Sequence, residues 1–250
     1  MNRYQNVAFI YTIRVSTLSL SVMSAKQLDL TALLDQTFFG LDTLSMLGDI
    51  EDFIEFSESN IGWQKHRELR RAEEECNDVR FDDPRLEAQY RDQMLDGVQF
   101  RFEVSLTQRV RYAALVSLIT TIEWVLIALR RRTSFEFPKT PDKKNEAVHI
   151  LSVFNAKASL GLEQKIVALE TLVFIRNCIV HAAGLLASYK HEKELRQTLS
   201  AWTGVKVSNQ NFLGDGIEIE TGFLEGVIKD VRQWLPEVEK AVSEQGLLQK

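Results

Sequence analysis

The 250-residue sequence contains few residues that interrupt or cross-link a chain: 12 glycines, 4 prolines and 2 cysteines. Because glycine and proline end regular elements, their scarcity favours long uninterrupted helices. Cys76 and Cys178 lie about a hundred positions apart, so they form neither a paired metal-binding motif nor a disulfide framework. Two unpaired thiols suit a reducing compartment, and we expect a cytoplasmic protein.

The sequence also lacks any excess of positive charge. Its formal net charge is −5, with 45% hydrophobic and 26% charged residues, which is an ordinary globular balance and excludes wholesale disorder. The negative charge argues against a protein that wraps nucleic acid over its whole surface, but it allows a local basic patch. The apolar run 113–129 is short for a membrane span of about 20 residues and contains Glu123. We interpret it as a buried core helix and expect no membrane association.

Three regions differ in their hydrophobic pattern. In residues 1–24 apolar and polar positions alternate as in a strand, so we expect a dispensable or poorly ordered extension; a secretory signal and a true start at Met23 are the alternatives. Residues 25–103 have the three- and four-residue spacing of helices and form an N-terminal helical region. The chain becomes deeply apolar from about residue 104, so we assign 104–250 to the central helical domain.

The N-terminal region predicts two long helical segments. An amphipathic helix begins near Leu28 and is expected to break at residues 60–62, before a charged helix that runs to about residue 79. A second segment spans 84–132, because Asp83 is a good cap and Pro84 suits the first helical position. A helix of that length extends about 70 Å, so it must either break near Gly97 or project one half away from the core.

The second half of the chain predicts further helices and one hairpin. We expect a helix over 143–160, a helix that opens at Leu162 or Glu163 and continues to about residue 201, and a last helix over 222–234 that Pro236 ends or kinks. Alternating apolar residues around Gly214-Asp215-Gly216 predict a small β-hairpin over about 204–220.

Polar residues emerge from an apolar helical pattern at Arg176-Asn177-Cys178-Ile179-Val180-His181, which Ala182-Ala183-Gly184 follows. This stretch resembles the signature of the HEPN superfamily: arginine, a polar residue, three to five further residues and histidine. The resemblance implies an all-α, antiparallel helical bundle. It also implies a homodimer in which two such motifs line one cleft, and a metal-independent endoribonuclease that needs no cofactor. Other members of that superfamily have lost catalysis and serve as scaffolds.

The three polar residues of the motif suit RNA cleavage by the neighbouring 2′-hydroxyl. An imidazole titrates near neutrality, so His181 can take or give a proton, and Arg176 can bind two phosphate oxygens. Asn177 can orient the imidazole or donate to phosphate. Residues five apart on an ideal helix point about 140° away from each other, so Arg176 and His181 cannot converge from one straight helix.

Glu123 is the one acidic residue in the apolar half of its helix, so it needs a partner or must take up a proton. Arg176 is the candidate partner, and several HEPN groups carry an acidic residue on the preceding helix; the alternative is that Glu123 faces solvent or caps another polar group. His66, His149 and His191 have no metal-ligand spacing, so we predict no metal site.

Two arginine clusters are further candidates for RNA contacts. The first cluster follows the apolar run and could instead complement a helix C-terminus. The second cluster could instead form ion pairs along its helix, Arg70 with Glu74 and Arg71 with Glu75. The clusters consist of Arg130, Arg131 and Arg132, and of Arg67, Arg70 and Arg71.

The sequence therefore favours an endoribonuclease that acts as a toxin or antiphage effector and is restrained by an antitoxin or regulatory partner. A catalytically silent scaffold with a structural Arg–Glu–His network at a dimer interface is the main alternative. A regulatory partner in a nucleotide-modification system is a third.

Overall fold

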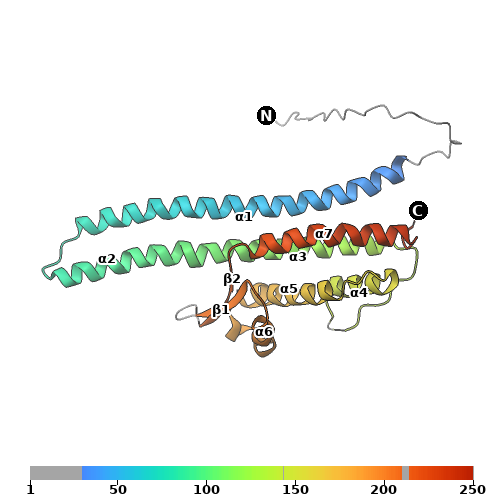
Figure 1. Cartoon of the computed structure of the whole chain (residues 1–250). Helices are drawn as coiled ribbons and strands as arrows, with labels where there is room; N and C mark the ends of the chain where they lie inside the picture. Colours follow the sequence, from blue (N-terminus) through green and yellow to red (C-terminus); the bar gives the residue numbers. More distant parts are fainter. Residues whose placement is uncertain (1–29, 143, 210–213, 250) are drawn as a thin grey trace, which may run out of the picture.

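The computed structural model describes residues 30–142, 144–209 and 214–249. The expected extension over residues 1–24, with its alternative start at Met23, lies outside the described residues. The described chain is mostly helical and carries one two-stranded sheet, as predicted. Two long helices lie side by side and extend well past a bundle formed by the second half of the chain (Figure 1).

Helix α1 spans Leu30–Asp78, 49 residues or about 73 Å of unbroken helix. The break expected at residues 60–62 is therefore wrong. A glycine within a helix costs only about 1 kcal/mol relative to alanine. Since α1 packs along both α3 and α2, contacts on either side of Gly62 hold the helix together.

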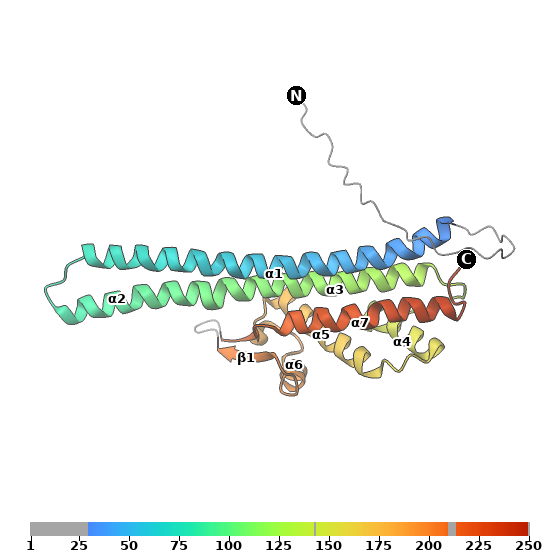
Figure 2. The same ribbon diagram turned by 45° about the horizontal axis from the view of Figure 1, so that its top comes forward.

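The second long segment is a continuous helical rod, but a short π-helical stretch separates two α-helices within it. Helix α2 (Pro84–Gln99) starts as predicted: the backbone N–H of Arg85 donates to the Asp83 carboxylate at 2.8 Å. A π-helical stretch, η1 (Phe100–Leu106), then leads into α3 (Thr107–Arg131). Of the two outcomes expected for this length, projection is the one observed: α2 leaves the bundle and runs back along α1 (Figures 1 and 2).

The remaining elements complete the bundle around α3. Helix α4 (Glu146–Ala158) leads to α5 (Glu163–Ala182), and a short 3-10 turn, η2 (Leu186–Ser188), precedes α6 (Glu192–Leu199). The continuous helix expected from the motif to residue 201 is therefore wrong. Strands β1 (Val205–Asn209) and β2 (Asp215–Ile219) pair antiparallel, which confirms the predicted hairpin.

The last helix, α7 (Phe223–Glu244), passes through Pro236, which the sequence predicts to end or kink it. Proline removes one backbone hydrogen bond, but buried side chains anchor the helix on both sides of it. Those residues are Leu224, Ile228, Val231, Trp234, Leu235, Val238 and Val242.

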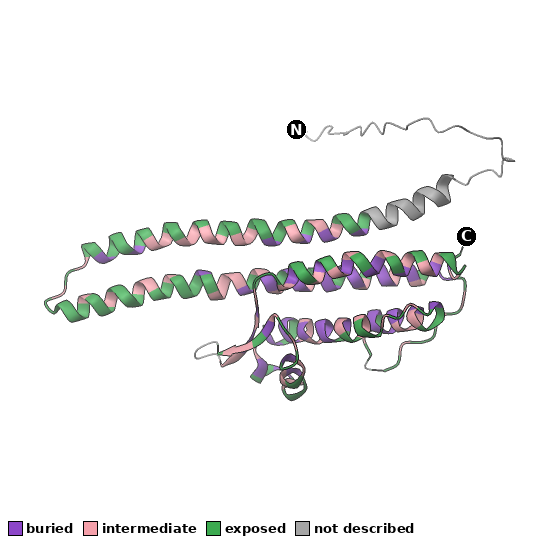
Figure 3. Ribbon diagram, in the orientation of Figure 1, coloured by how far each residue is buried: buried purple, intermediate pink, exposed green. Residues whose placement is uncertain are grey.

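Helix α3 is the centre of the core. Leu118, Ile119, Ile122 and Leu126 are fully buried, and Leu47, Ile50 and Ile54 of α1 belong to the same cluster (Figure 3). Burying such side chains stabilises the fold by about 1.5–3 kcal/mol each, which makes this helix the main hydrophobic contributor. By length and composition the rod 84–131 could also cross a membrane, with a mean hydropathy of 1.9 in its most apolar window, but half of that window is buried within the molecule. The buried core helix of a soluble protein can have the same length and apolar composition.

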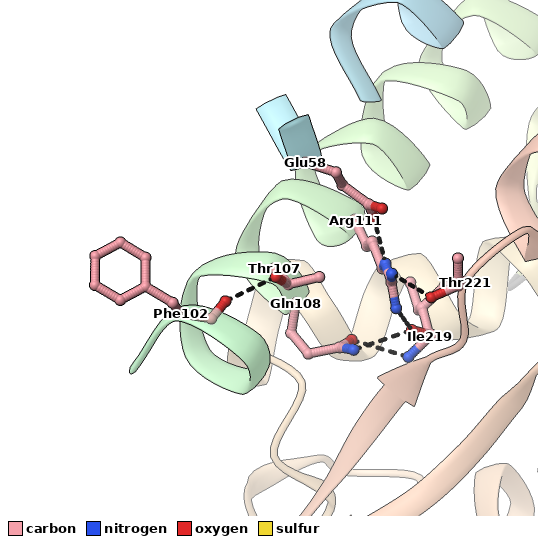
Figure 4. Close-up of polar contacts among 7 residues, drawn as sticks. All are labelled: Glu58, Phe102, Thr107, Gln108, Arg111, Ile219 and Thr221. Carbon is pink, nitrogen blue, oxygen red and sulfur yellow. Dashed lines mark hydrogen bonds and ion pairs between the residues drawn. The ribbon is translucent and has the colours of Figure 1, made fainter. Parts of the chain in front are cut away.

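A buried polar network joins the hairpin to the long helices (Figure 4). The Arg111 guanidinium, on a residue only 8% exposed, donates to Glu58 of α1 at 2.7 Å and to the backbone carbonyl of Ile219 at 2.7 Å. It also donates to the Thr221 hydroxyl at 2.7 Å. Gln108 exchanges two hydrogen bonds of 2.9 Å with the backbone of Ile219. One cation therefore ties α1, α3 and the end of β2 together.

Helix α5 ends at a tight left-handed turn directly after the motif. Ala183 and Gly184 have φ angles of 52° and 82°, and the N–H groups of both donate to the carbonyl of Cys178. The turn directs the chain onto β2, where the carbonyl of Gly184 accepts from the N–H of Ile217 at 2.9 Å. A Cβ atom on Gly184 would lie 2.5 Å from the Tyr112 hydroxyl oxygen.

We expect the substitution Gly184→Ala to lower the free energy of unfolding by about 2–4 kcal/mol, since it combines left-handed backbone strain with a steric clash. Urea denaturation followed by circular dichroism measures this loss. Gly246→Ala is the matched control, because Gly246 also has a positive φ after a helix but a Cβ there meets nothing within 4 Å. The control should lose only about 1 kcal/mol, and equal losses in the two variants would contradict the proposed clash.

Candidate functional site

The motif occupies the last two turns of α5, where one side of the helix is buried and the other is open. Cys178 and Ile179 point into the core, whereas Asn177 is partly exposed and His181 is exposed. Asn177 and His181 are four residues apart and so share one face of the helix. Arg176 lies on a different side, which agrees with the angular separation calculated from the sequence.

Arg176 forms an ion pair with Glu123 of α3. The predicted pairing is therefore confirmed, and the side chains are 20% and 23% exposed, respectively. Asn145 completes the arrangement: its amide N–H donates to Glu123 Oε1 at 3.0 Å, while its side-chain oxygen caps α4 by accepting from the N–H of Ala147 at 2.9 Å. The Glu123 carboxylate thus joins three helices at one point.

The ion pair does not satisfy the whole guanidinium. Within the described residues, Arg176 Nε is buried and has no hydrogen-bond partner. A buried N–H without an acceptor costs about 1–3 kcal/mol. Arg176 therefore retains hydrogen-bonding capacity at a position that the fold holds in place through Glu123.

We expect Glu123→Ala to lower the free energy of unfolding by about 2–3 kcal/mol, because it leaves a largely buried guanidinium without its anionic partner. Urea denaturation measures the change. Glu136→Ala, at an exposed loop residue, serves as the control and should stay within about 0.5 kcal/mol of the wild type. A Glu123 variant as stable as that control would mean that the ion pair contributes nothing to folding.

A groove of about 620 Å³ lies beside the motif, between α5, the start of α4 and α6. Asn177 and Phe174 line it from α5, and Lys144 lines it from the loop before α4. Neither Arg176 nor His181 is among the lining residues, although Asn145, which contacts Glu123, is. The full lining consists of Lys144, Asn145, Val148, Val167, Glu170, Thr171, Val173, Phe174, Asn177 and Thr198.

Phe174, which lines the groove, packs against the buried Tyr189 and the partly exposed His191. The rings of Tyr189 and His191 lie 5.7 and 6.0 Å from that of Phe174, and 5.9 Å from each other. The sequence reasoning missed Lys144, Tyr189 and His191 because they lie outside the motif helix. Lys144 precedes α4, and Tyr189 and His191 follow the turn at Gly184.

A second, smaller hollow of about 220 Å³ opens directly after the motif. Ala183 and Gly184 line it together with Arg109, an exposed cation of α3. The sequence reasoning also missed Arg109, since its proximity to the end of α5 follows from the antiparallel packing of α3 and α5.

The predicted arginine clusters do not gather at the motif. Arg130 forms an ion pair with Glu146, and Arg132 contacts Glu239 at 3.4 Å. Arg130 lies seven residues beyond Glu123, about 10 Å along α3. The end of α5 lies the other way along α3, at Tyr112. The structure therefore places the first cluster away from His181, at the C-terminal end of α3, where cations complement the helix dipole.

The second cluster, Arg67, Arg70 and Arg71, lies on the part of α1 that projects beyond the bundle. Arg71 pairs with Glu75 at 3.0 Å, which confirms that predicted pair. No ion pair joins Arg70 to Glu74 in the described chain, so that prediction is wrong.

Cys178 is fully buried, and burial raises the pKa of its thiol to about 11, so it stays protonated at neutral pH and packs in the core. Among the described residues, no group of three or more His, Cys, Asp or Glu side chains is placed to hold a metal ion.

The architecture defines a mainly helical bundle with a projecting helical hairpin, a small β-hairpin and a polar site at the end of α5. The sequence matches no known family and no curated protein, and the fold matches no solved structure.

Proposed function

We propose that this protein is an endoribonuclease of the HEPN superfamily, with an antiparallel HEPN-like bundle, that acts in the cytoplasm as a toxin or antiphage effector. The observation that carries the proposal is the arrangement at the end of α5. Glu123 on the preceding α3 anchors Arg176, while His181 is exposed one helical turn after Asn177, which lines the 620 Å³ groove. This is the constellation that the resemblance implies for RNA cleavage.

In the proposed reaction the 2′-oxygen of RNA attacks the adjacent phosphorus. The O2′–P bond forms and the P–O5′ bond breaks, which yields a 2′,3′-cyclic phosphate and a 5′-hydroxyl end. His181 takes the 2′-hydroxyl proton as general base, and a second imidazole protonates the leaving O5′. Arg176 stabilises the charge that develops on the phosphoryl oxygens, and Asn177 positions the phosphate or the imidazole.

A homodimer supplies the geometry that one chain lacks. Because Arg176 and His181 point about 140° apart on α5, a shared cleft needs Arg176 of one copy opposite His181 of the other. Two apolar side chains on the open side of α5, Val167 and Val180, are 61% and 52% exposed and so are available to such an interface. The second copy also provides the second imidazole for the leaving group.

The test is an RNA-cleavage assay with end-labelled RNA in EDTA, using wild type, Arg176→Ala and His181→Ala, all verified as folded by circular dichroism. We expect only the wild type to cleave and its products to carry cyclic phosphate and 5′-hydroxyl ends. Growth arrest on expression in bacteria, relieved by either substitution, would support the role as a toxin. Cleavage by all three proteins at one rate would trace the activity to a contaminant and remove the support for the motif.

A catalytically silent scaffold is the second candidate. The ion pair of Arg176 with Glu123, which Asn145 also contacts, favours it because this pair already gives the arginine a structural role. For a scaffold, wild type and both variants leave RNA intact, and Arg176→Ala loses stability while His181→Ala does not.

A further inference from the structure

The projecting hairpin, residues 59–106 of α1, α2 and η1, has almost no core of its own. Only Ala72, Cys76 and Phe102 are buried there, and α2 contributes no buried residue (Figure 3). A helix normally buries its apolar stripe against another element. Within the described chain no third element covers this pair of helices.

The exposed side of α1 in this hairpin carries an ordered set of side chains, which we name the outer stripe: Trp63, Arg67, Arg70, Glu74 and Asp78. Their spacing of three and four residues places them on one face, opposite the buried Ala72 and Cys76. All five are exposed, and Trp63 is 60% exposed.

The charges of the outer stripe are largely uncompensated. Arg67 contacts Glu68 at 3.3 Å and lies over the Trp63 ring at 5.3 Å. Arg70, Glu74 and Asp78 form no ion pair with any residue that the structure describes. One cation and two anions of the outer stripe therefore remain available for ion pairs with a complementary surface.

The outer stripe is complementary to itself when it is reversed. Arg70 lies two residues before Ala72 and Glu74 lies two residues after it. Arg67 lies five residues before Ala72 and Asp78 lies six residues after it. An antiparallel copy with its twofold axis at Ala72 therefore places each arginine opposite an acidic residue, as an isologous interface requires. Trp63 lies nine residues before Ala72, and Phe81 lies nine residues after it. In the antiparallel arrangement Trp63 therefore lies at the hairpin tip of the second copy, at the level of Phe81.

We propose that a second copy of this chain docks antiparallel on the outer stripe, so that the α1 helices of two projecting hairpins pack against each other. Nucleic acid is the less suitable occupant, since the tip beyond Arg71 would repel phosphates. Residues 73–83 carry one arginine, Arg80, and these acids: Glu73, Glu74, Glu75, Asp78, Asp82 and Asp83. The interface is separate from the α5 face, so it does not depend on the proposed nuclease.

Sedimentation velocity of the full chain, with charge reversals on the outer stripe, tests the proposal. Arg67→Glu/Arg70→Glu makes the stripe wholly acidic, and Glu74→Arg/Asp78→Arg makes it wholly basic. Each variant alone should weaken self-association at least about tenfold, because like charges face each other across the twofold axis. An equimolar mixture should restore the wild-type assembly, since every facing pair is then opposite in charge.

The matched control is Lys139→Glu/Lys240→Glu, which makes the same net-charge change as the acidic variant at exposed bundle positions. It should assemble as the wild type does. If the α5 faces also associate, the wild type should be a tetramer and each reversal variant a dimer. If they do not, the wild type should be a dimer and each reversal variant a monomer. A monomeric wild type, reversal variants that assemble normally, or a mixture that stays dissociated would each overturn the proposal, whatever the outcome of the RNA assay.

Discussion

Replacement of His181 by alanine is expected to lower the rate of RNA cleavage by about 10²–10⁴-fold, the usual contribution of a general acid or base. His181 is exposed on the open face of α5, so its loss removes the proton acceptor without opening a cavity. The free energy of unfolding should therefore stay within about 0.5 kcal/mol of the wild type. Single-turnover cleavage of a labelled RNA, with urea denaturation of the same preparations, measures both quantities.

His66→Ala is the matched control for this prediction, because His66 is also exposed but lies on the projecting part of α1. It should cleave RNA at the wild-type rate. An active wild type whose His181→Ala variant retains full activity would show that the chemistry resides elsewhere. A variant that loses activity and several kcal/mol of stability together would instead make His181 a structural residue.

Replacement of Arg111 by methionine is expected to cause the largest loss of stability, about 3–5 kcal/mol, as for other buried ion pairs that lose one partner. Methionine fills much of the same volume but leaves Glu58 unpaired and removes the donors to the Ile219 carbonyl and the Thr221 hydroxyl. Urea denaturation followed by circular dichroism measures the loss.

A second substitution separates the ion pair from the rest of the network. With Glu58→Leu added, the unpaired carboxylate disappears and a substantial part of the stability should return, since buried ion pairs can often be replaced by apolar pairs. Arg109→Met, at an exposed position on the same helix, should change stability by less than about 0.5 kcal/mol. A similar loss in Arg109→Met and Arg111→Met would mean that the network in Figure 4 is not what stabilises this junction.

Features with a local cause were predictable from the residues alone. The cap at Asp83 and the pairing of β1 with β2 follow from turn and capping preferences that act over a few residues. The Glu123–Arg176 pair was also predictable, although 53 residues separate its partners, because a carboxylate in an apolar helix must find a cation. The break predicted at residues 60–62 is wrong, and Pro236 does not end α7, because packing along the neighbouring helices outweighs the local cost of a glycine or a proline. The helix predicted to continue from the motif to residue 201 ends at Ala182 instead.

The sequence by itself determined that the chain is mainly helical, that it carries a C-terminal hairpin, and that Arg176 and His181 leave α5 on different sides. Those properties depend on hydrophobic periodicity and helix geometry, which are local. Only the tertiary structure decided that α5 ends at Ala182, with Gly184 packed against Tyr112. It also decided that Lys144 and Thr198, from other elements, line the groove beside Asn177, and that α1 and α2 project together. Each of these results from contacts between segments far apart in the chain, where the free energy of packing exceeds local preference.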